Sequence, residues 1–474
     1  TTFHQTVAGL AIARRLKAWD DPPVVVFGGA NCEGEMGSQL ARSFPWIDYV
    51  CTGEGDLVVP DFIEALLGGG DPPPADGIVS GSSSGMTLPA LVEDMDGLPY
   101  PDFDDYFAQA AELPLAPPVR ASIETARGCW WGAKHHCTFC GLNGLTMPFR
   151  SKSPDRVFDE VMRIGRRYDT ARVDAVDNIL DLRYVETLFP RLAEADYRPA
   201  LFFETKANLT HRQLRLLRAG GVESLQPGIE SLSDQVLTLM RKGCTAQQNV
   251  RLLRWCAELD VEAWWNVIYG FPGEDPDEYA RMADLIPLIA HLQPPRFVGP
   301  IRLDRFSPYH SEPGAFGIDA VRPAPAYREV FPVGDAELER LAYYFDFDAN
   351  GAGSACDPGS YVEPTRDAIR EWLRAAPTAR LDAVSLGDAV LVLDDRPCAR
   401  QPSHVLTGAA AAVHELADSP RTTESLVREL RDGYAEPEVE DALAALVNAR
   451  LVWPSGDRNL TLAVFRNRDP DGGA

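Results

Sequence analysis

Three cysteines that lie close together are the strongest chemical signal in the sequence. Cys129 is followed by Cys137 and Cys140, in a Cys-x7-Cys-x2-Cys pattern that comes directly after a predicted strand. Three thiolates from one loop can hold three irons of a 4Fe-4S cluster and leave the fourth iron open to another ligand. The alternative is a structural zinc site, whose fourth ligand would be His135 or His136. We favour the cluster because structural zinc loops rarely open a long series of strands and helices.

The cysteines stand at the start of a series of strands that alternate with helices. Six apolar runs bounded by polar turns are typical of buried strands, and helical patterns such as Pro154–Tyr168 fill the gaps. Such a series predicts a parallel sheet with right-handed crossovers, and six units can form an open barrel whose functional end is the carboxyl edge of its strands. The predicted strands are Ser122–Arg127, Ala171–Val176, Ala200–Glu204, Ser224–Gly228, Ala263–Tyr269 and Arg296–Arg302.

Two shorter units of strand and glycine turn precede this barrel. Val24–Phe27 leads into Gly28 and Gly29, and Ile47–Thr52 leads into the turn 53–55. Glycines directly after parallel strands let a ligand approach the backbone at the carboxyl end of a sheet. Two units are fewer than a Rossmann-type domain needs. We therefore expect a partial domain whose first part precedes this sequence.

The end of the chain has a different pattern. Leu381–Asp394 predicts a β-hairpin, three short helices follow, and a second apolar hairpin closes the segment. Three helices and a β-wing are typical of a winged helix-turn-helix. The third helix is acidic, at Glu436, Glu438, Glu440 and Asp441, which favours peptide binding over a DNA-reading role. The predicted helices are Thr407–Leu416, Thr422–Arg431 and Glu436–Ala449.

Together these patterns predict an α/β chain with three folded parts. We expect a partial Rossmann-like domain, a partial (β/α)6 barrel and a C-terminal winged-helix-like α+β domain. The predicted boundaries are 1–97 for the Rossmann-like domain, 98–120 for a linker, 121–315 for the barrel, 316–378 for a helical extension and 379–474 for the winged-helix, peptide-recognition-like domain.

Composition narrows the classes of partner. The 474 residues include 70 acidic and 45 basic ones, for a net charge of −25, which argues against a large phosphate-binding face and hence against nucleic acid as a partner. No apolar run approaches the roughly 18 residues of a membrane span, and the first residues do not resemble a signal peptide. Nine cysteines are too few for a disulfide scaffold. We expect a cytoplasmic protein with no membrane partner.

The stretch from Glu124 to Asn143, which holds the three cysteines, resembles the signature of a known family. It is similar to radical S-adenosylmethionine (SAM) enzymes, and more narrowly to ribosomal-peptide (RiPP) maturation radical SAM proteins of the cobalamin-dependent class B C-methyltransferase type. The resemblance extends over about Val24 to Tyr309. It implies that Cys129, Cys137 and Cys140 ligate a 4Fe-4S cluster, and that SAM and methylcobalamin are the other cofactors.

The same resemblance implies further site residues. SAM contacts are expected at the ends of successive barrel strands, where loops converge, and cobalamin contacts in the N-terminal glycine turns. Tyr309, after the last strand, is a candidate catalytic residue near a substrate radical. The expected SAM residues are Phe139, Asp177, Asn178, Glu204, Lys206, Gln226, Glu230, Ser231, Arg241 and Tyr269. The expected cobalamin residues are Gly28, Gly29, Asn31, Gly53, Glu54 and Gly55.

The function implied by the resemblance is methylation of an unactivated side-chain carbon in a ribosomally made precursor peptide. The winged domain would bind the leader of that peptide, and a donor such as flavodoxin or ferredoxin would supply electrons. One alternative is a radical SAM peptide cyclase or rearrangement enzyme with the same cofactors. A second alternative, from another class, is a zinc-stabilised winged-helix regulator without catalysis.

Overall fold

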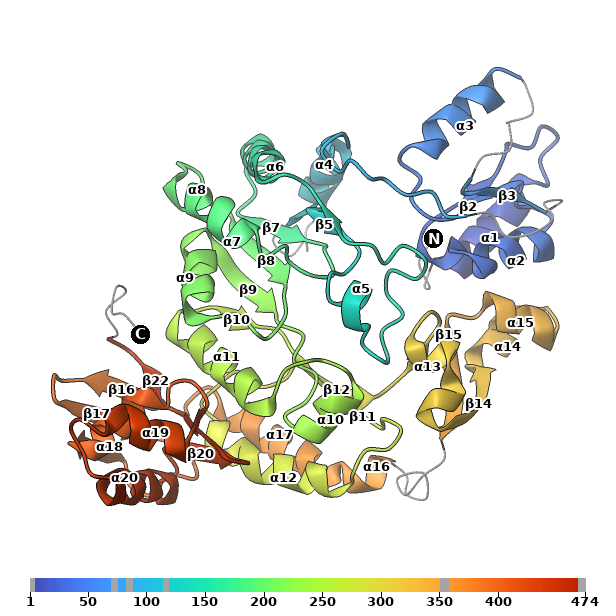
Figure 1. Cartoon of the computed structure of the whole chain (residues 1–474). Coiled ribbons are helices and arrows are strands. Elements are labelled where there is room, and N and C mark those ends of the chain that lie inside the picture. The colour runs from blue at the N-terminus through green and yellow to red at the C-terminus, as the bar shows by residue number, and fades with distance from the viewer. Residues whose placement is uncertain (1–4, 70–75, 82–87, 114–118, 350–357, 468–474) are drawn as a thin grey trace. The chain divides into compact units, whose positions relative to one another are not determined.

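The computed structural model describes residues 5–69, 76–81, 88–113, 119–349 and 358–467. The chain forms two compact units that do not follow the order of the sequence, and their elements are labelled in Figure 1. The cysteine loop, predicted as part of the barrel domain, groups with the N-terminal segment. The first unit comprises Thr1–Tyr100, Thr125–Arg156 and Arg302–Ser354, and the second comprises Pro101–Glu124, Val157–Ile301 and Ala355–Ala474.

The second unit contains the predicted parallel sheet. Five strands pair in parallel in the order β10-β9-β8-β7-β4, and β11 pairs in parallel with β12. All six predicted ranges contain strands, but two of them are divided. In the first, Ala121–Ile123 joins the parallel sheet, whereas Ala126–Arg127 pairs antiparallel with Arg150–Ser151 in a separate sheet. The fifth is divided into β10 and β11 at Trp264 and Trp265. The strands are β4 (Ala121–Ile123), β7 (Arg172–Ala175), β8 (Ala200–Glu204), β9 (Val222–Gln226), β10 (Glu262–Ala263), β11 (Asn266–Tyr269) and β12 (Phe297–Pro300).

Helices fill the connections between these strands, as expected for right-handed crossovers. Thr210 and Thr245 each begin a helix with a capping box, in which the threonine hydroxyl and a glutamine three residues later satisfy free backbone N–H groups. Two helices are thereby fixed at their first turn. The helices are α6 (Pro154–Tyr168), α7 (Tyr184–Thr187), α8 (Phe189–Glu194), α9 (His211–Ala219), α10 (Asp234–Leu239), α11 (Ala246–Glu258), α12 (Asp277–Leu285) and the 3-10 helix η2 (Ile286–Ile289).

The predicted linker 98–120 contains a helix, α4 (Asp104–Glu112), and its residues 114–118 lie outside the described part of the chain. The ring of Phe107 stacks on Tyr168 of α6 with 4.6 Å between ring centres. The backbone N–H of Phe103 donates to the Tyr168 hydroxyl at 2.7 Å. These aromatic contacts attach α4 to the barrel.

The N-terminal segment forms a small three-stranded sheet with the two predicted strand-and-glycine units. β1 and β2 are parallel, whereas β3 is antiparallel to β2. The apolar core of this sheet includes Leu40 and Val50, and it is completed by Phe331 and Leu338 from a distant part of the first unit. The elements are α1 (Thr6–Leu16), β1 (Val26–Phe27), η1 (Ala30–Cys32), α2 (Glu35–Ser43), β2 (Tyr49–Cys51), α3 (Val58–Leu67) and β3 (Ile78–Ser80).

The segment after the barrel contains strands that the sequence analysis missed, so the prediction of a helical extension over 316–378 is wrong in part. β14 and β15 pair antiparallel within the sheet β13-β15-β14. β15 alternates aromatic and acidic residues, which is typical of a strand with one buried face. The elements are β13 (Leu303–Asp304), α13 (Pro308–Ser311), η3 (Pro313–Phe316), β14 (Ile318–Pro323), α14 (Ala326–Val330), α15 (Asp335–Leu341), β15 (Tyr344–Ala349), α16 (Pro358–Tyr361) and α17 (Glu363–Ala375).

The C-terminal part has the predicted winged-helix architecture. This part contains three helices and a four-stranded sheet in the order β18-β17-β16-β22. A second sheet, in the order β19-β21-β20, contains the wing, which is the hairpin of β20 and β21. Both predicted hairpins and all three predicted helices are confirmed. The elements are β16 (Leu381–Ser385), β17 (Ala389–Asp394), β18 (Ser403–Thr407), α18 (Ala409–Leu416), β19 (Arg421–Thr422), α19 (Thr423–Leu430), α20 (Glu436–Asn448), β20 (Val452–Ser455), β21 (Arg458–Thr461) and β22 (Val464–Phe465).

Polar contacts from α11 join the winged domain to the barrel within the second unit. The side chain of Arg254 is fully buried and pairs with the carboxylate of Asp418 at 2.5 Å. Gln247 donates from Nε2 to the carbonyl oxygens of Trp453 and Arg458, at 3.1 Å each. A buried charge is stable only when it is paired. These contacts therefore fix the winged domain on the barrel.

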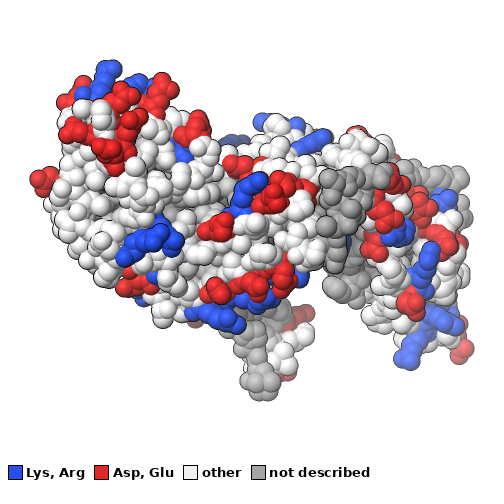
Figure 2. Space-filling model, turned by 90° about the horizontal axis from the view of Figure 1, so that it is seen from below, with Lys and Arg blue, Asp and Glu red and all other residues white. Residues whose placement is uncertain are grey.

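The surface carries charges of both signs. On the face shown in Figure 2, acidic side chains form several groups with basic ones interspersed among them. This pattern agrees with the net charge of −25. Among the residues that the structure describes, no helix is both long and apolar enough to cross a membrane.

Candidate functional site

A short hairpin closes the loop that carries the three cysteines. β5 (Ala126–Arg127) pairs antiparallel with β6 (Arg150–Ser151), at the two ends of the loop. Gly128 follows β5 with φ +77°, and a side chain there would collide with the carbonyl oxygen of Pro148. The backbone N–H of Cys129 donates to the carbonyl oxygen of Met147 at 3.2 Å. The position of Cys129 is therefore set by the returning strand of its own loop.

The three predicted cluster ligands are half-buried cysteines in the first unit. The backbone N–H of Gly132, at the start of α5 (Gly132–His135), lies 3.2 Å from Cys129 Sγ and stabilises negative charge on it. No three His, Cys, Asp or Glu side chains in the described ranges converge on a single metal ion. A 4Fe-4S cluster makes a different demand, because each cysteine binds a separate iron. The donor set of this loop suits that group.

Both histidines of the zinc alternative contact other groups of the same loop. Nε2 of His136 lies 2.9 Å from the carbonyl oxygen of Cys140. The ring of His135 packs against Trp131 with 4.2 Å between ring centres. His136 also has a positive φ of 42°, at the point where α5 ends. These contacts give both imidazoles a role in the shape of the loop.

Tyr309 lies in the first unit, together with the cysteine loop. Its side chain is 1% exposed, and its ring packs edge-on against Phe316 with 4.8 Å between ring centres. Its backbone N–H donates to the carbonyl oxygen of Thr138 at 3.0 Å, directly beside the predicted SAM residue Phe139. The predicted catalytic tyrosine therefore contacts the cysteine loop through its backbone.

In the second unit, the ends of three parallel strands bring buried charged groups together. Asp177 after β7, Glu204 at the end of β8 and Glu230 after β9 interact electrostatically. Lys242 lies 3.8 Å from Glu230, and the Lys206 ammonium donates to the Lys242 carbonyl oxygen. The structure thus assembles four of the predicted SAM residues, and it adds Lys242 as the cation that faces Glu230.

Two buried polar atoms in this group have no hydrogen-bond partner in the described part of the chain. They are Thr205 Oγ1 and Glu230 Oε2. Leaving a buried polar atom unpaired costs about 1–3 kcal/mol, so each of these atoms is available to bond with water or with a polar ligand. SAM carries an ammonium, a carboxylate and ribose hydroxyls. The residues at these strand ends therefore fit that cofactor.

The pKa of Glu204 is raised to about 7, chiefly because burial disfavours the charged carboxylate. The negative charges of Glu230 and Asp177 raise it further, and the positive charge of Lys242 opposes them. Burial also raises the pKa of Glu230, again against Lys242. Near neutral pH, Glu204 is therefore protonated in part of the molecules and can donate a hydrogen bond as well as accept one.

Replacing Glu204 by Gln should stabilise the chain at pH 8 in the absence of SAM. Between pH 4.5 and about 7 the folded state binds more protons than the unfolded state, so the free energy of unfolding falls as the pH rises. The raised pKa of Glu204 lowers the free energy of unfolding by about 3 kcal/mol at pH 8, and glutamine, which does not ionise, avoids this loss. Urea unfolding should give the same free energy of unfolding for the parent and the variant at pH 4, and a higher value for the variant at pH 8. An equal gain at both pH values would contradict the assigned pKa.

The remaining predicted SAM residues occupy several environments. Tyr269 is 4% exposed, and its hydroxyl accepts a hydrogen bond from Arg366 at 2.7 Å. Ser231 is fully buried, and its hydroxyl accepts from the N–H of Ser233 at 3.1 Å, next to the start of α10. Arg241 is exposed with φ 56°. Gln226 ends β9 and Asn178 follows Asp177, and both are half-buried.

Glu274 fixes the turn that follows β11. This glutamate is 3% exposed and accepts from the N–H groups of Gly270 and Phe271 at 2.7 and 2.9 Å. It also accepts from the Tyr279 hydroxyl at 2.7 Å and pairs with Tyr361. The Gly-Phe-Pro-Gly-Glu motif after β11 was the available signal, since a glutamate after a glycine turn can bond back to its own loop.

The N-terminal glycine turns follow β1 and β2, as predicted. Gly29 and Gly53 have φ values of 95° and 85°, in the left-handed region that favours glycine. Asn31 donates from Nδ2 to Thr6 Oγ1 at 2.6 Å, and its Oδ1 is buried without a hydrogen-bond partner among the described residues. The turns and this oxygen are compatible with a polar ligand such as a cobalamin side chain.

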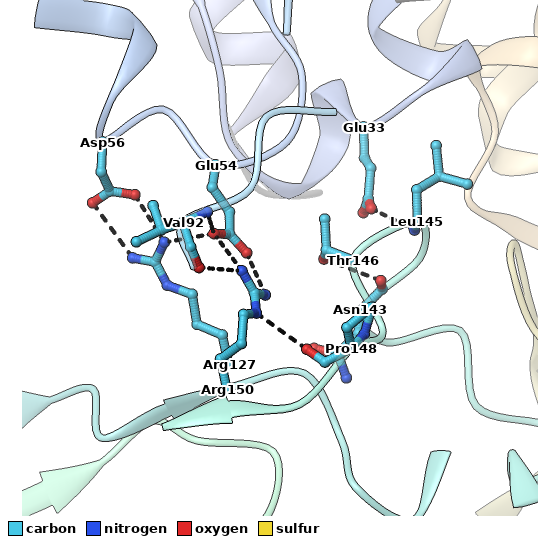
Figure 3. A network of polar contacts seen from close by, with 10 residues as sticks. All are labelled: Glu33, Glu54, Asp56, Val92, Arg127, Asn143, Leu145, Thr146, Pro148 and Arg150. Atoms are coloured by element: carbon cyan, nitrogen blue, oxygen red, sulfur yellow. Dashed lines mark hydrogen bonds and ion pairs between the residues drawn. The ribbon is translucent and has the colours of Figure 1, made fainter. Parts of the chain in front are cut away.

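Glu54, also predicted to contact cobalamin, is engaged within the protein. Figure 3 shows its carboxylate between the guanidinium groups of Arg127 and Arg150, which extend from β5 and β6. Burial alone would raise the pKa of Glu54, but hydrogen bonds from Arg150, Val92 and Arg127 outweigh this and hold the pKa below its usual value. Gly53 and Gly55 on either side leave this turn close to neighbouring backbone and side chains.

Comparison with known proteins finds a family match within the series of strands and helices. The model of the radical SAM superfamily matches residues 123–286. An uncharacterized methyltransferase from Pyrococcus horikoshii is 24% identical over 279 residues, which cover 56% of this chain and 58% of that protein. An anaerobic magnesium-protoporphyrin IX monomethyl ester cyclase from Synechocystis is 25% identical over 51% of this chain and 49% of its own length. The chain thus spans about half the length of the curated relatives it matches.

Solved structures share the fold over most of the chain. The cobalamin-dependent SAM radical enzyme OxsB, with aqua-cobalamin and SAM bound, superposes with a TM-score of 0.59 and 14% identity over 95% of this chain and 62% of that chain. The radical SAM methyltransferase TsrM from Kitasatospora setae, with tryptophan and a SAM analogue, has a TM-score of 0.57 and 17% identity over 76% of this chain and 74% of that chain. Residues 123–286 therefore match the radical SAM superfamily, and the chain shares its fold with cobalamin-dependent radical SAM enzymes.

Proposed function

We propose that this chain is a cobalamin-dependent radical SAM methyltransferase that acts on an unactivated side-chain carbon of a ribosomally made precursor peptide. The observation that carries the proposal is the loop with three half-buried cysteines, Cys129, Cys137 and Cys140, within the matched radical SAM domain. The relatives named as methyltransferases and the shared fold support the reaction class. The buried polar groups at the strand ends support SAM as a ligand.

The chain's own residues would bind and orient the reacting groups. A hydrogen on an unactivated carbon is not acidic enough for a protein base, so a cofactor must supply the chemistry. When bound, SAM supplies a 5′-deoxyadenosyl radical and methylcobalamin supplies the methyl group. The three cysteines would hold the cluster, Glu204 and Glu230 would bind polar groups of SAM, and the glycine turns would lie against cobalamin. A reductant such as flavodoxin or ferredoxin would deliver the electron.

The winged domain offers a surface for the leader of the peptide. β18 is the outer strand of its sheet and pairs only with β17 in the described part of the chain. Val405, in the middle of β18, is 70% exposed. An extended peptide can add to such an edge by main-chain hydrogen bonds, with its side chains read by neighbouring surfaces. This supports leader binding along β18.

The test is transfer of a labelled methyl group from SAM to candidate precursor peptides, each supplied with and without its leader. We expect a protein reconstituted anaerobically to hold about four irons and one cobalt, and a peptide with its leader to gain one methylene in mass. Iron without cobalt would overturn the methylcobalamin assignment. Zinc alone would overturn the enzyme proposal.

Ring formation in the peptide is a second candidate reaction, because one of the relatives of this chain is named as a cyclase. Ring formation in the peptide would remove two hydrogens from its mass and add no label. The same assay therefore separates the two reactions. Equal rates with and without the leader would contradict recognition by β18.

A further inference from the structure

The turn after β2 connects the N-terminal fold to the cysteine loop, through four charged residues that we call the Glu54 network: Glu54, Asp56, Arg127 and Arg150. All four lie in the first unit, and Figure 3 shows the two carboxylates pointing toward the two arginines. Arg127 belongs to β5 and Arg150 to β6, which are paired partners in the hairpin that closes the loop. One turn therefore contacts both strands of that hairpin.

The contacts of Glu54 satisfy its carboxylate completely. Arg150 forms a bidentate contact, donating to Oε1 at 2.7 Å and to Oε2 at 2.9 Å. Arg127 donates to Oε2 at 3.1 Å. The backbone N–H of Val92 adds a bond to Oε2 at 2.7 Å. Asp56 takes the other side of Arg127, at 2.8 Å. Two positive and two negative charges thus balance.

Burial makes these contacts strong. The side chains of Glu54, Arg150 and Arg127 are only 12%, 13% and 16% exposed. Ion pairs with little access to water are weakly screened, and paired arginine and carboxylate groups also fix direction. Removing the carboxylate of Glu54 would leave the buried guanidinium of Arg150 without its ion-pair partner and Arg127 with Asp56 alone. The network therefore determines where the hairpin lies on the N-terminal fold.

A second contact holds the same loop near its C-terminal end. Glu33, before α2, accepts from the backbone N–H of Leu145 at 2.7 Å. Arg150 also donates from Nε to the carbonyl oxygen of Pro148 at 3.2 Å. Residues 145–150 are thus attached to the N-terminal fold at both ends of the segment. Met147, between these points, accepts the hydrogen bond from the N–H of Cys129.

We propose that Glu54 is a positioning residue for the cysteine loop, which holds Cys129 in place through Arg127, Arg150 and the segment 145–150. This inference rests on the proposed function in taking Cys129 as a cluster ligand. It gives the side chain of Glu54 a role different from direct contact with cobalamin. The order of the loop before the cluster forms depends on this network.

The experiment uses the full chain with Glu54→Gln, which keeps the shape of the side chain and removes its charge. Lys134 is exposed and is the one trypsin site between Arg127 and Arg150 in the sequence. We expect tryptic cleavage at Lys134 in the iron-free chain to become about tenfold faster, because the loop opens more often. Loss of the cluster to a chelator, followed by its absorbance, should accelerate by a similar factor in the reconstituted chain.

Controls separate positioning from general stability. Glu54→Asp keeps the charge and should retain part of the protection of Lys134 against trypsin. Arg150→Lys should lose the bidentate contact with the Glu54 carboxylate and be cleaved as fast as Glu54→Gln. Asp348→Asn removes the exposed pair of Asp348 with Arg322 in the same unit and should leave cleavage at Lys134 unchanged. The thermal unfolding midpoint is measured for each variant.

Cleavage at Lys134 equal to that of the parent would overturn the proposal. Cleavage that rises only in proportion to a drop in the unfolding midpoint would also overturn it, because the role would then be structural in general. If Glu54→Gln does not fold, the proposal is tested with Arg150→Lys by the same measurements of cleavage at Lys134 and loss of the cluster. Failure of the parent chain to bind iron would overturn the proposed function, whereas the cleavage assay on the iron-free chain would still decide the role of Glu54.

Discussion

Serine in place of Cys129, Cys137 or Cys140 will leave the chain without a stable 4Fe-4S cluster. Serine hydroxyls ionise far less readily than thiols and are poor ligands for iron in such clusters. Iron content after anaerobic reconstitution should fall from about four per chain to near zero, and release of 5′-deoxyadenosine from SAM should fall to background. Iron analysis and product chromatography measure both quantities.

Cys398 provides the matched control for this prediction. It is a half-buried free cysteine between β17 and β18, and its Sγ contacts the carbonyl oxygen of Pro287 at 3.1 Å, a contact that a serine hydroxyl can keep. We expect Cys398→Ser to bind iron as the parent does. Full iron content in any of the three loop variants would contradict the ligand assignment for that cysteine.

Replacing Asp394 by Asn should destabilise the second unit by about 3–5 kcal/mol, because it leaves a buried charge without its partner. Asp394 and Arg396 form an ion pair of 2.7 Å between side chains with no exposed surface. Arg396 also donates to the carbonyl oxygens of Leu288 in the barrel and Arg450 in the winged domain. Loss of the carboxylate therefore weakens the attachment between these two parts.

Urea unfolding, followed by tryptophan fluorescence, measures this loss. The neighbouring Asp395 is exposed, so Asp395→Asn should change the free energy of unfolding by less than about 0.5 kcal/mol. A similar small change in Asp394→Asn would mean that solvent reaches Arg396 in the folded chain. Because the unit is large, the midpoint and slope of the transition are compared as well.

Local patterns predicted most of the elements. The strand β8 occupies the predicted range Ala200–Glu204, and α6 the predicted range Pro154–Tyr168. Apolar runs and helical spacing are local features, so a sequence displays them directly. The exception was β14 and β15, within a segment predicted to be helical. The alternation in β15 is a local strand pattern that the sequence analysis missed. Its pairing with β14 joins segments more than twenty residues apart, and no local pattern reveals that pairing.

The site divides in the same way. The spacing of Cys129, Cys137 and Cys140 is a property of one loop, and the family resemblance, together with placement after successive strands, selected Asp177 and Glu204. Lys242, rather than its neighbour Arg241, faces Glu230 in the structure. Which of two adjacent side chains points toward a buried carboxylate depends on backbone geometry, here a positive φ at Arg241.

The sequence by itself determined the cysteine loop, the series of parallel strands and the winged domain, because spacing and periodicity along the chain are enough to specify them. Only the tertiary structure decided the contacts of Glu54, whose partners Arg127 and Arg150 are 73 and 96 residues away in the chain. Ion pairs depend on distance through space and on the exclusion of water, and both arise only when remote segments pack together. The same packing groups the cysteine loop with the N-terminal fold.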